Sequence, residues 1–173
     1  MMKKMALAML PMLPMLPMLG GCVMAVGNTT TQAPPVAIES ETISYETSRC
    51  FGTCPVYRVT VQPDGSGVFE GRQFTKVVGI RSFRATPAQY RAFAAKLQPY
   101  RPRDGEQLIQ PGQPGCGQVA TDMPSVDIRW NEISGAAQHL SLYYGCRMHD
   151  QAMNEALRSA PNELPIRQFI EVN

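Results

Sequence analysis

Cysteine offers more chemistry than any other residue type in this chain, and the spacing of the cysteines limits what that chemistry is. Three residues separate Cys50 from Cys54, and Cys116 and Cys146 lie far downstream. Thiolates so arranged can exchange disulfides or bind a soft metal such as Cu(I), and oxidised thiols can close two disulfides. The fifth cysteine, Cys22, stands apart behind an apolar stretch. The choice between these chemistries depends on the compartment in which the chain folds.

The N-terminal segment predicts export. Lys3 and Lys4 precede an apolar stretch, residues 5–19, and a Leu-Gly-Gly sequence leads directly into Cys22. A basic start, a short apolar region and small residues before a cleavage point are typical of a secretory signal. The stretch is shorter than the roughly 20 residues of a membrane-spanning helix, and three prolines interrupt it. With a cysteine at the cut, the segment resembles the lipobox of bacterial lipoproteins.

This resemblance implies a processed, membrane-attached protein. In lipoproteins the cysteine is linked to diacylglycerol and N-acylated, and several acyl chains anchor stably where one does not. Residues 1–21 are then a signal peptide and Cys22 is the lipidated residue. In that family an aspartate after the cysteine favours the inner membrane; Val23 stands there, which implies the outer membrane, facing the periplasm. The alternative is an ordinary secretory signal with a chance cysteine.

The charge balance disfavours several classes of partner. The chain has 16 basic and 14 acidic residues, and two basic ones, Lys3 and Lys4, belong to the predicted signal peptide. The remainder is formally neutral and has no Lys/Arg run, so it lacks the electrostatic footprint for nucleic acid or an anionic membrane surface. We expect no cofactor. The expected partners are the membrane, through the lipid anchor, and an envelope protein, with any small ligand unspecified.

The four remaining cysteines are expected to form two disulfides, because an exported chain folds in an oxidising compartment. Three pairings are open. The short spacing of Cys50 and Cys54 favours a small ring, which leaves Cys116 to pair with Cys146. Loop entropy gives about 2 kcal/mol for the small ring and about 3.5 kcal/mol for the large one. The large ring would hold a long loop against the strand that ends near Cys146.

Two thiol-based alternatives use the same cysteines. A redox dithiol ordinarily has two intervening residues at a helix N-terminus, whereas here there are three and Pro55 leads into a strand. The Cys-x-x-x-Cys-Pro spacing is similar to the copper-binding motif of Sco-type assembly proteins, which implies Cu(I) on Cys50, Cys54 and a distant histidine, with His149 the candidate. The chain lacks the thioredoxin-like order of those proteins. A zinc site on all four cysteines would need reduced thiols.

A hydrolase-like set of polar residues is also present. Asp127, His139 and Ser141 fall on the polar face of a predicted hairpin. A nucleophile needs its base within hydrogen-bond reach and an oxyanion hole, whereas same-face residues of a regular strand stand side by side with their amides already bonded. We therefore interpret the set as cross-strand polar pairs on a solvated face and expect no enzyme.

Periodicity predicts the elements that position these residues. Residues 22–37 form the lipidated cysteine and a tether, polar and without apolar period, and residues 38–173 form a single domain. Alternating apolar residues predict four early strands, separated at one point by a Pro-Asp-Gly turn. Those strands span residues 38–47, 56–62, 68–74 and 77–84.

The second half mixes helices with a hairpin. Thr86 opens a helix with a capping box, and Tyr90 and Phe93 lie on its predicted core side. Residues 99–124 are predicted to be a structureless loop, with Arg101 and Arg103 solvated rather than forming an anion site. A hairpin over residues 126–144 and helices opening at Asp150 and Asn162 complete the chain. The order predicts an α+β fold: a largely antiparallel sheet of about six strands, one helix after strand four and one or two C-terminal helices.

A second resemblance lies at the small ring. Residues 49–57, with the Pro-Asp-Gly turn that follows, resemble the signature Cys-Phe-Gly-x-Cys-Pro-x-Tyr of an uncharacterised bacterial domain family that is often lipid-anchored. The Asp-Met-Pro-Ser segment at 122–125 also fits. The resemblance brings no activity; it implies that Cys50 and Cys54 are a self-contained unit. The sequence thus predicts a lipid-anchored envelope protein with a non-catalytic binding or structural domain, the alternative being a copper-binding or thiol-active protein using Cys50 and Cys54.

Overall fold

A computed structural model describes residues 41–147 and 150–171. The described elements all belong to one compact unit, Ala37–Asn173. The predicted signal peptide and tether, with Cys22 and Val23, lie outside the described residues, and so does His149. Among the helices of the described part, none is long and apolar enough to cross a membrane.

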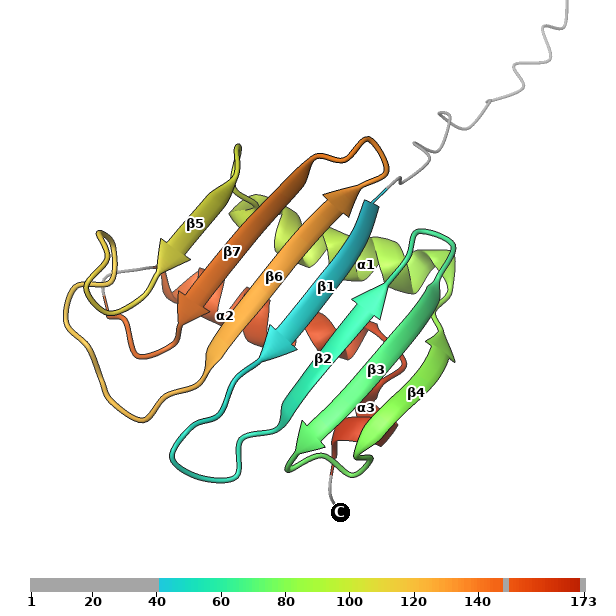
Figure 1. Ribbon diagram of the computed structural model, residues 1–173, viewed down its shortest axis with the longest axis horizontal. Helices are drawn as coiled ribbons and strands as arrows, with labels where there is room; N and C mark the ends of the chain where they lie inside the picture. Colours follow the sequence, from blue (N-terminus) through green and yellow to red (C-terminus); the bar gives the residue numbers. More distant parts are fainter. Residues whose placement is uncertain (1–40, 148–149, 172–173) are drawn as a thin grey trace, which may run out of the picture. The chain divides into compact units, whose positions relative to one another are not determined.

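The domain is built on a single open sheet of seven strands (Figure 1). In space the strands follow the order β4-β3-β2-β1-β6-β7-β5. Neighbours are antiparallel except β5 and β7, which are parallel. The strands are β1 (Glu41–Thr47), β2 (Val56–Val61), β3 (Ser66–Gln73), β4 (Gly79–Arg84), β5 (Glu106–Ile109), β6 (Ser125–Glu132) and β7 (Ala137–Tyr143).

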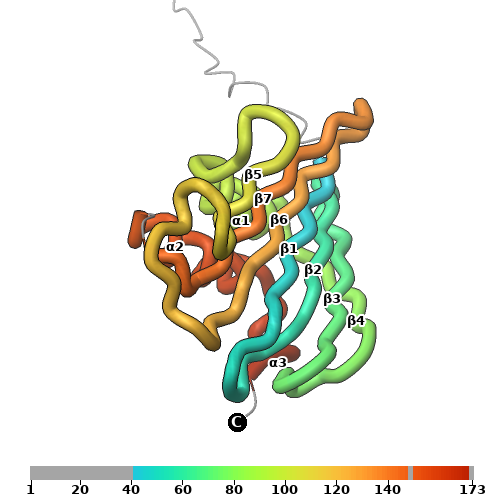
Figure 2. Tube along the Cα trace, turned by 60° about the vertical axis from the view of Figure 1, so that its left-hand side comes forward, coloured from blue at the N-terminus to red at the C-terminus, as the bar shows by residue number. Residues whose placement is uncertain are grey.

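The helices cover one face of this sheet, and the other face is open (Figures 1 and 2). They are α1 (Pro87–Leu97), α2 (Gln151–Ser159) and α3 (Arg167–Ile170), with 3-10 turns η1 (Gln98–Tyr100) and η2 (Ala160–Glu163). The predicted capping box starts α1: the Thr86 hydroxyl accepts from the Gln89 amide, and the Gln89 side chain accepts from the Thr86 amide. The α+β architecture is therefore confirmed.

Strand alternation separates a buried face from a polar one. Side chains pointing toward the helices form the core, among them Tyr45 and Trp130, which are fully buried, and Tyr90 and Phe93 from α1. The open face carries charged pairs such as Arg58 with Glu46. A strand places successive residues on opposite faces, so the same strands that build the core also fix which polar residues share the open face.

The strand count was predicted too low, because residues 99–124 contain β5. This strand has four residues, lies at the sheet edge and pairs in parallel with β7. Four residues are too few for an alternation of apolar and polar side chains to predict a strand. The solvated reading of Arg101 is also wrong. Its side chain is 15% exposed and bonds to Glu41 and Glu132 in ion pairs of 2.6 and 3.0 Å. Arg103 is exposed.

The C-terminal layer also differs from expectation in its last helix. The helix predicted to open at Asn162 begins at Arg167, and Asn162 lies in η2. Pro165 lies between the two turns, and the residue before a proline is driven out of the helical region, as seen in the extended backbone of Leu164. Pro161 and Asn162 therefore belong to η2, and Ile170 belongs to the separate helix α3.

Candidate functional site

Two disulfides organise the end of the sheet where β1 and β7 finish. Cys50 pairs with Cys54 and Cys116 with Cys146, which is the pairing that the sequence favoured. The large ring holds the long loop as expected: Val119 forms a β-bridge with Cys146. All four of these cysteines are therefore oxidised.

The small ring positions the start of β2. Gly52 has φ of 148°, a conformation that side-chain-bearing residues rarely adopt. Below the ring, the Thr47 hydroxyl donates to the Pro55 carbonyl at 2.7 Å and accepts from the Tyr57 amide at 3.1 Å. Thr47 thus bonds to the two residues on either side of Val56 and fixes the first residues of β2 against the end of β1. The ring itself presents Phe51 to solvent, 89% exposed.

The second segment singled out in the sequence, residues 122–125, lies beside this ring. The Asp122 carbonyl accepts from the Phe51 amide at 3.1 Å, and Asp122 has φ of 68°. The Met123 amide donates to the Tyr143 hydroxyl at 3.2 Å. These bonds bring the start of β6 against the start of β2, although about 70 residues of chain separate them.

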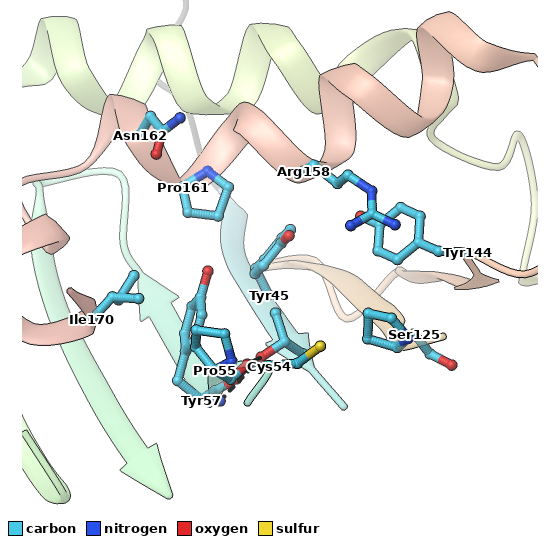
Figure 3. A pocket seen from close by; sticks show the side chains of 12 residues that line it. Tyr45, Cys54, Pro55, Tyr57, Ser125, Tyr144, Arg158, Pro161, Asn162 and Ile170 are labelled. Atoms are coloured by element: carbon cyan, nitrogen blue, oxygen red, sulfur yellow. Dashed lines mark hydrogen bonds between the residues drawn. The ribbon is translucent and has the colours of Figure 1, made fainter. Parts of the chain in front are cut away.

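A cavity of about 280 Å³ opens where these segments meet the helical layer (Figure 3). It lies between the end of β1 and the start of β2 on one side and α2, η2 and α3 on the other. Both singled-out segments contribute to its wall. The lining residues are Tyr45, Thr47, Cys54, Pro55, Tyr57, Pro124, Ser125, Tyr144, Arg158, Pro161, Asn162 and Ile170.

Three tyrosines give the cavity an aromatic and uncharged interior. Burial raises the pKa of Tyr45 and of Tyr57 well above the ordinary value of a phenol, and the neighbouring tyrosines raise both further. Burial likewise raises the pKa of Tyr144 to about 12, although the charge of Arg158 acts to lower it. All three phenols are thus neutral and carry their protons at physiological pH.

The hydroxyls of these tyrosines differ in what they bind. Tyr45 donates to the Leu157 carbonyl at 3.0 Å. Tyr144 is 8% exposed and its buried oxygen has no hydrogen-bond partner: the Tyr45 and Tyr144 hydroxyls influence each other's pKa but do not meet hydrogen-bond geometry. Within the described residues, Tyr57 also makes no hydrogen bond through its hydroxyl. The cavity therefore contains two phenol donors without an acceptor.

Arg158 supplies the charge of the cavity. Its guanidinium carbon lies 3.8 Å from the centre of the Tyr144 ring, and Figure 3 shows the two groups stacked. Stacking occupies the face of a guanidinium and leaves its N–H edge free. Across residues 41–147 and 150–171, no carboxylate lies within ion-pair distance of Arg158. No acidic side chain appears among the described lining residues.

The comparison with protein families gives one match. Residues 41–165 match the family described as Domain of unknown function (DUF6438). The chain belongs to this family. Neither the curated proteins nor the solved structures gave a match. The match spans β1 through η2, so nearly the whole lining of the cavity lies inside the family domain.

The hydrolase-like residues of the family domain lie elsewhere, on the open face. His139 contacts Glu106 through Nδ1 at 2.5 Å and Asp127 through Nε2 at 2.9 Å. The expectation of a solvated face is wrong here, because His139 is 9% exposed and Ser141 is 1% exposed. The long loop reaches over them, and the Ser141 hydroxyl accepts from the Gln110 side-chain amide at 2.6 Å. Both imidazole nitrogens are occupied by carboxylates, so the structure brings His139 to Asp127 but not to Ser141.

The metal alternatives find little support in the described part of the family domain. No group of three or more His, Cys, Asp or Glu residues there has the geometry to hold a metal ion. The disulfides leave Cys50, Cys54, Cys116 and Cys146 without the thiolate that copper or zinc would bind. The proposed third copper ligand, His149, is outside the described residues.

Sequence reasoning placed Cys54, Pro55 and Tyr57 in a motif but missed the residues that complete the cavity. Arg158 was overlooked because an arginine in the last turn of a helix is ordinarily a surface residue. Tyr144 was predicted only as the last residue of the hairpin over residues 126–144. No usable signal existed: Glu155 stands three residues before Arg158, a spacing at which helical ion pairs commonly form, so the missing partner could not be predicted.

Proposed function

We propose that this protein is a lipid-anchored binding protein of the cell envelope, whose domain holds a small ligand in the cavity without transforming it. The observation that carries the proposal is convergence: the two segments that resemble the family signature, far apart in sequence, form one wall of one cavity. Pro55 and Tyr57 come from the first segment, and Pro124 and Ser125 from the second. Concave sites with few polar groups among apolar walls are typical of ligand pockets.

The polar groups of the cavity favour binding over catalysis. Tyr57, Tyr144 and Arg158 are hydrogen-bond donors at neutral pH, and the described lining contains no histidine or carboxylate to accept a proton. General base catalysis needs such an acceptor within reach of the substrate. Donors without a base hold a ligand and orient it, which is the behaviour of a binding site.

The position of the cavity suits a protein attached through its N-terminal side. Glu41 starts β1 and Thr47, which lines the cavity, ends it, so the two ends are roughly 20 Å apart. The chain therefore enters β1 at Glu41, the end of the strand remote from the cavity-lining Thr47.

A fragment screen tests the binding proposal. Small organic fragments are added to the full-length protein, and NMR shifts of the tyrosines are recorded for the wild type, Asn162→Trp and Arg91→Trp. Asn162 is exposed at the cavity rim, where tryptophan blocks access, and Arg91 is exposed on α1 away from it. We expect binders to shift Tyr57 and Tyr144 in the wild type and in Arg91→Trp only. Binders that tolerate Asn162→Trp would refute the assignment of the site.

Mass spectrometry tests the anchor. The protein purified from membranes should begin at Cys22 and carry acyl chains, because the segment before Cys22 resembles a lipobox. Cys22→Ser should accumulate as unlipidated precursor, whereas Val23→Ala should be processed normally. A mature N-terminus at another residue, without acyl mass, would contradict the proposed anchorage and leave the cavity assignment intact.

A further inference from the structure

We propose that the ligand is a small organic carboxylate with an apolar body about the size of one aromatic ring. This inference rests on the proposed binding function and specifies its ligand. The carboxylate is placed at the guanidinium edge of Arg158, and the apolar body lies among the rings and prolines of the cavity.

The positive charge of Arg158 in the cavity favours an anionic ligand. Arg158 is the one charged side chain in the described lining, and within the described residues it has no ion-pair partner. Its guanidinium carbon lies 3.8 Å from the centre of the Tyr144 ring, and this stacking favours one orientation of the group before a ligand arrives. A planar guanidinium with a free edge matches the two oxygens of a carboxylate in a bidentate pair. A cationic ligand would meet this charge without compensation.

The phenols add donors of the same kind. The Tyr144 oxygen is buried without a hydrogen-bond partner, so it meets an acceptor when a ligand displaces the side chains that cover it. The Tyr57 hydroxyl is also without a partner among the described residues and faces the cavity in Figure 3. Together with Arg158 they offer donors and no acceptors, so the complementary group is one that only accepts, as an ionised carboxylate does.

The walls and size define the rest of the ligand. Pro55, Pro124 and Pro161 line the cavity beside the tyrosine rings. Apolar walls favour an apolar body, and a volume of about 280 Å³ lies at the small end of ligand pockets, roughly 300 to 1,000 Å³. A single guanidinium balances one negative charge, which favours a carboxylate over a doubly charged phosphate.

Calorimetric titration of the full-length protein, in one non-ionic detergent, tests the inference with two matched probes. 3-Phenylpropionate has the carboxylate, and 3-phenyl-1-propanol has the same body without the charge. We expect the acid to bind the wild type at least tenfold more tightly than the alcohol. Arg158→Gln should abolish that preference, Arg158→Lys should retain part of it, and the exposed control Arg91→Gln should retain all of it. Equal melting temperatures for the four proteins establish that each is folded.

The outcomes separate this inference from the proposed function. If both probes bind equally to the wild type and Asn162→Trp blocks both, the cavity is a binding site and the carboxylate assignment is wrong. If the acid binds but Arg158→Gln keeps its preference, the carboxylate lies elsewhere and the inference fails. If neither probe binds at millimolar concentration, a ring-sized carboxylate is not the ligand. If both probes bind and Asn162→Trp blocks neither, the cavity is not their binding site and the proposed function is refuted together with this inference.

Discussion

Arg101 and Arg158 have similar aromatic surroundings and opposite electrostatic ones. Each guanidinium lies over an aromatic ring: Arg101 at 5.8 Å from the centre of Trp130, Arg158 at 3.8 Å from that of Tyr144. Arg101 is 15% exposed and bonds two carboxylates and the Gln138 amide oxygen. Arg158 is exposed and has no carboxylate partner in the described chain.

The difference separates architecture from recognition. Arg101 joins the start of β1 to the end of β6 through Glu41 and Glu132. Its charge is therefore paired within the fold and stabilises the sheet. Arg158 contributes nothing comparable to the fold, although its guanidinium is held in place by a ring. A fixed charge without an internal partner is what a binding site requires. The two residues thus predict opposite outcomes when each is replaced.

The largest expected effect is on the stability of Arg101→Gln. Removing one member of a buried ion pair leaves its partner without compensation, at a cost of about 3 kcal/mol for a pair that solvent still partly reaches. Urea unfolding measures this loss, and Arg91→Gln, an exposed helical arginine, is the control with an expected change below about 0.5 kcal/mol. A stable Arg101→Gln variant would erase the contrast between the two arginines.

Opening the small ring should have the next largest effect and should act on the cavity side of the molecule. The double replacement Cys50→Ser with Cys54→Ser removes a cross-link worth about 2 kcal/mol by loop entropy. Because Cys54 and Pro55 line the cavity, affinity for 3-phenylpropionate should also fall. Arg101→Gln, measured where it is still folded, should keep its affinity. Unchanged affinity in the ring-opened protein would show that the ring does not shape the site.

Raising the pH should destabilise the fold because the buried tyrosines resist ionisation. The folded pKa of Tyr144 is raised to about 12, so its stabilising contribution is complete below pH 10 and is lost as pH rises from there to about 12. At pH 11 the loss is about 1 kcal/mol for this group. Tyr144→Phe should therefore lose less stability than the wild type between pH 8 and pH 11 in urea unfolding. Equal losses in both proteins would contradict the burial of this hydroxyl.

The smallest expected change in stability belongs to Arg158→Gln. Its guanidinium stacks on the Tyr144 ring, and an exposed cation–π contact contributes about 0.5 kcal/mol. The substitution should still be visible in a spectroscopic tyrosine titration: Arg158 lowers the pKa of Tyr144, so removing its charge should move that ionisation to higher pH. A loss of stability as large as that of Arg101→Gln would make Arg158 a structural residue.

The regular parts of the fold could be predicted because their signals are local. Alternating apolar residues predicted β2 and β6, and the capping box at Thr86 predicted α1. The strand β5 could not be predicted, because four residues at a sheet edge are held by parallel pairing with a distant strand. The same holds for the C-terminal turn at Asn162, where Pro165 outweighs the helical spacing of the apolar residues that follow.

The site could be predicted only where it lies in one segment. Cys54 and Tyr57 stand in a recognisable local pattern, so they were singled out. Arg158 is brought to them by the packing of α2 on the sheet, and its importance depends on a missing partner, which no local pattern records. The open-face residue His139 shows the converse, since its spacing suggested chemistry and the structure pairs it with two carboxylates.

The most direct test of the central claim is a crystal structure of the protein grown with 3-phenylpropionate. We predict that the ring of the acid lies among Tyr57, Pro55 and Pro161, with the carboxylate oxygens within hydrogen-bond distance of the Arg158 guanidinium and the Tyr144 hydroxyl. A ligand bound on the open face of the sheet, or a carboxylate directed away from Arg158 into solvent, would contradict it.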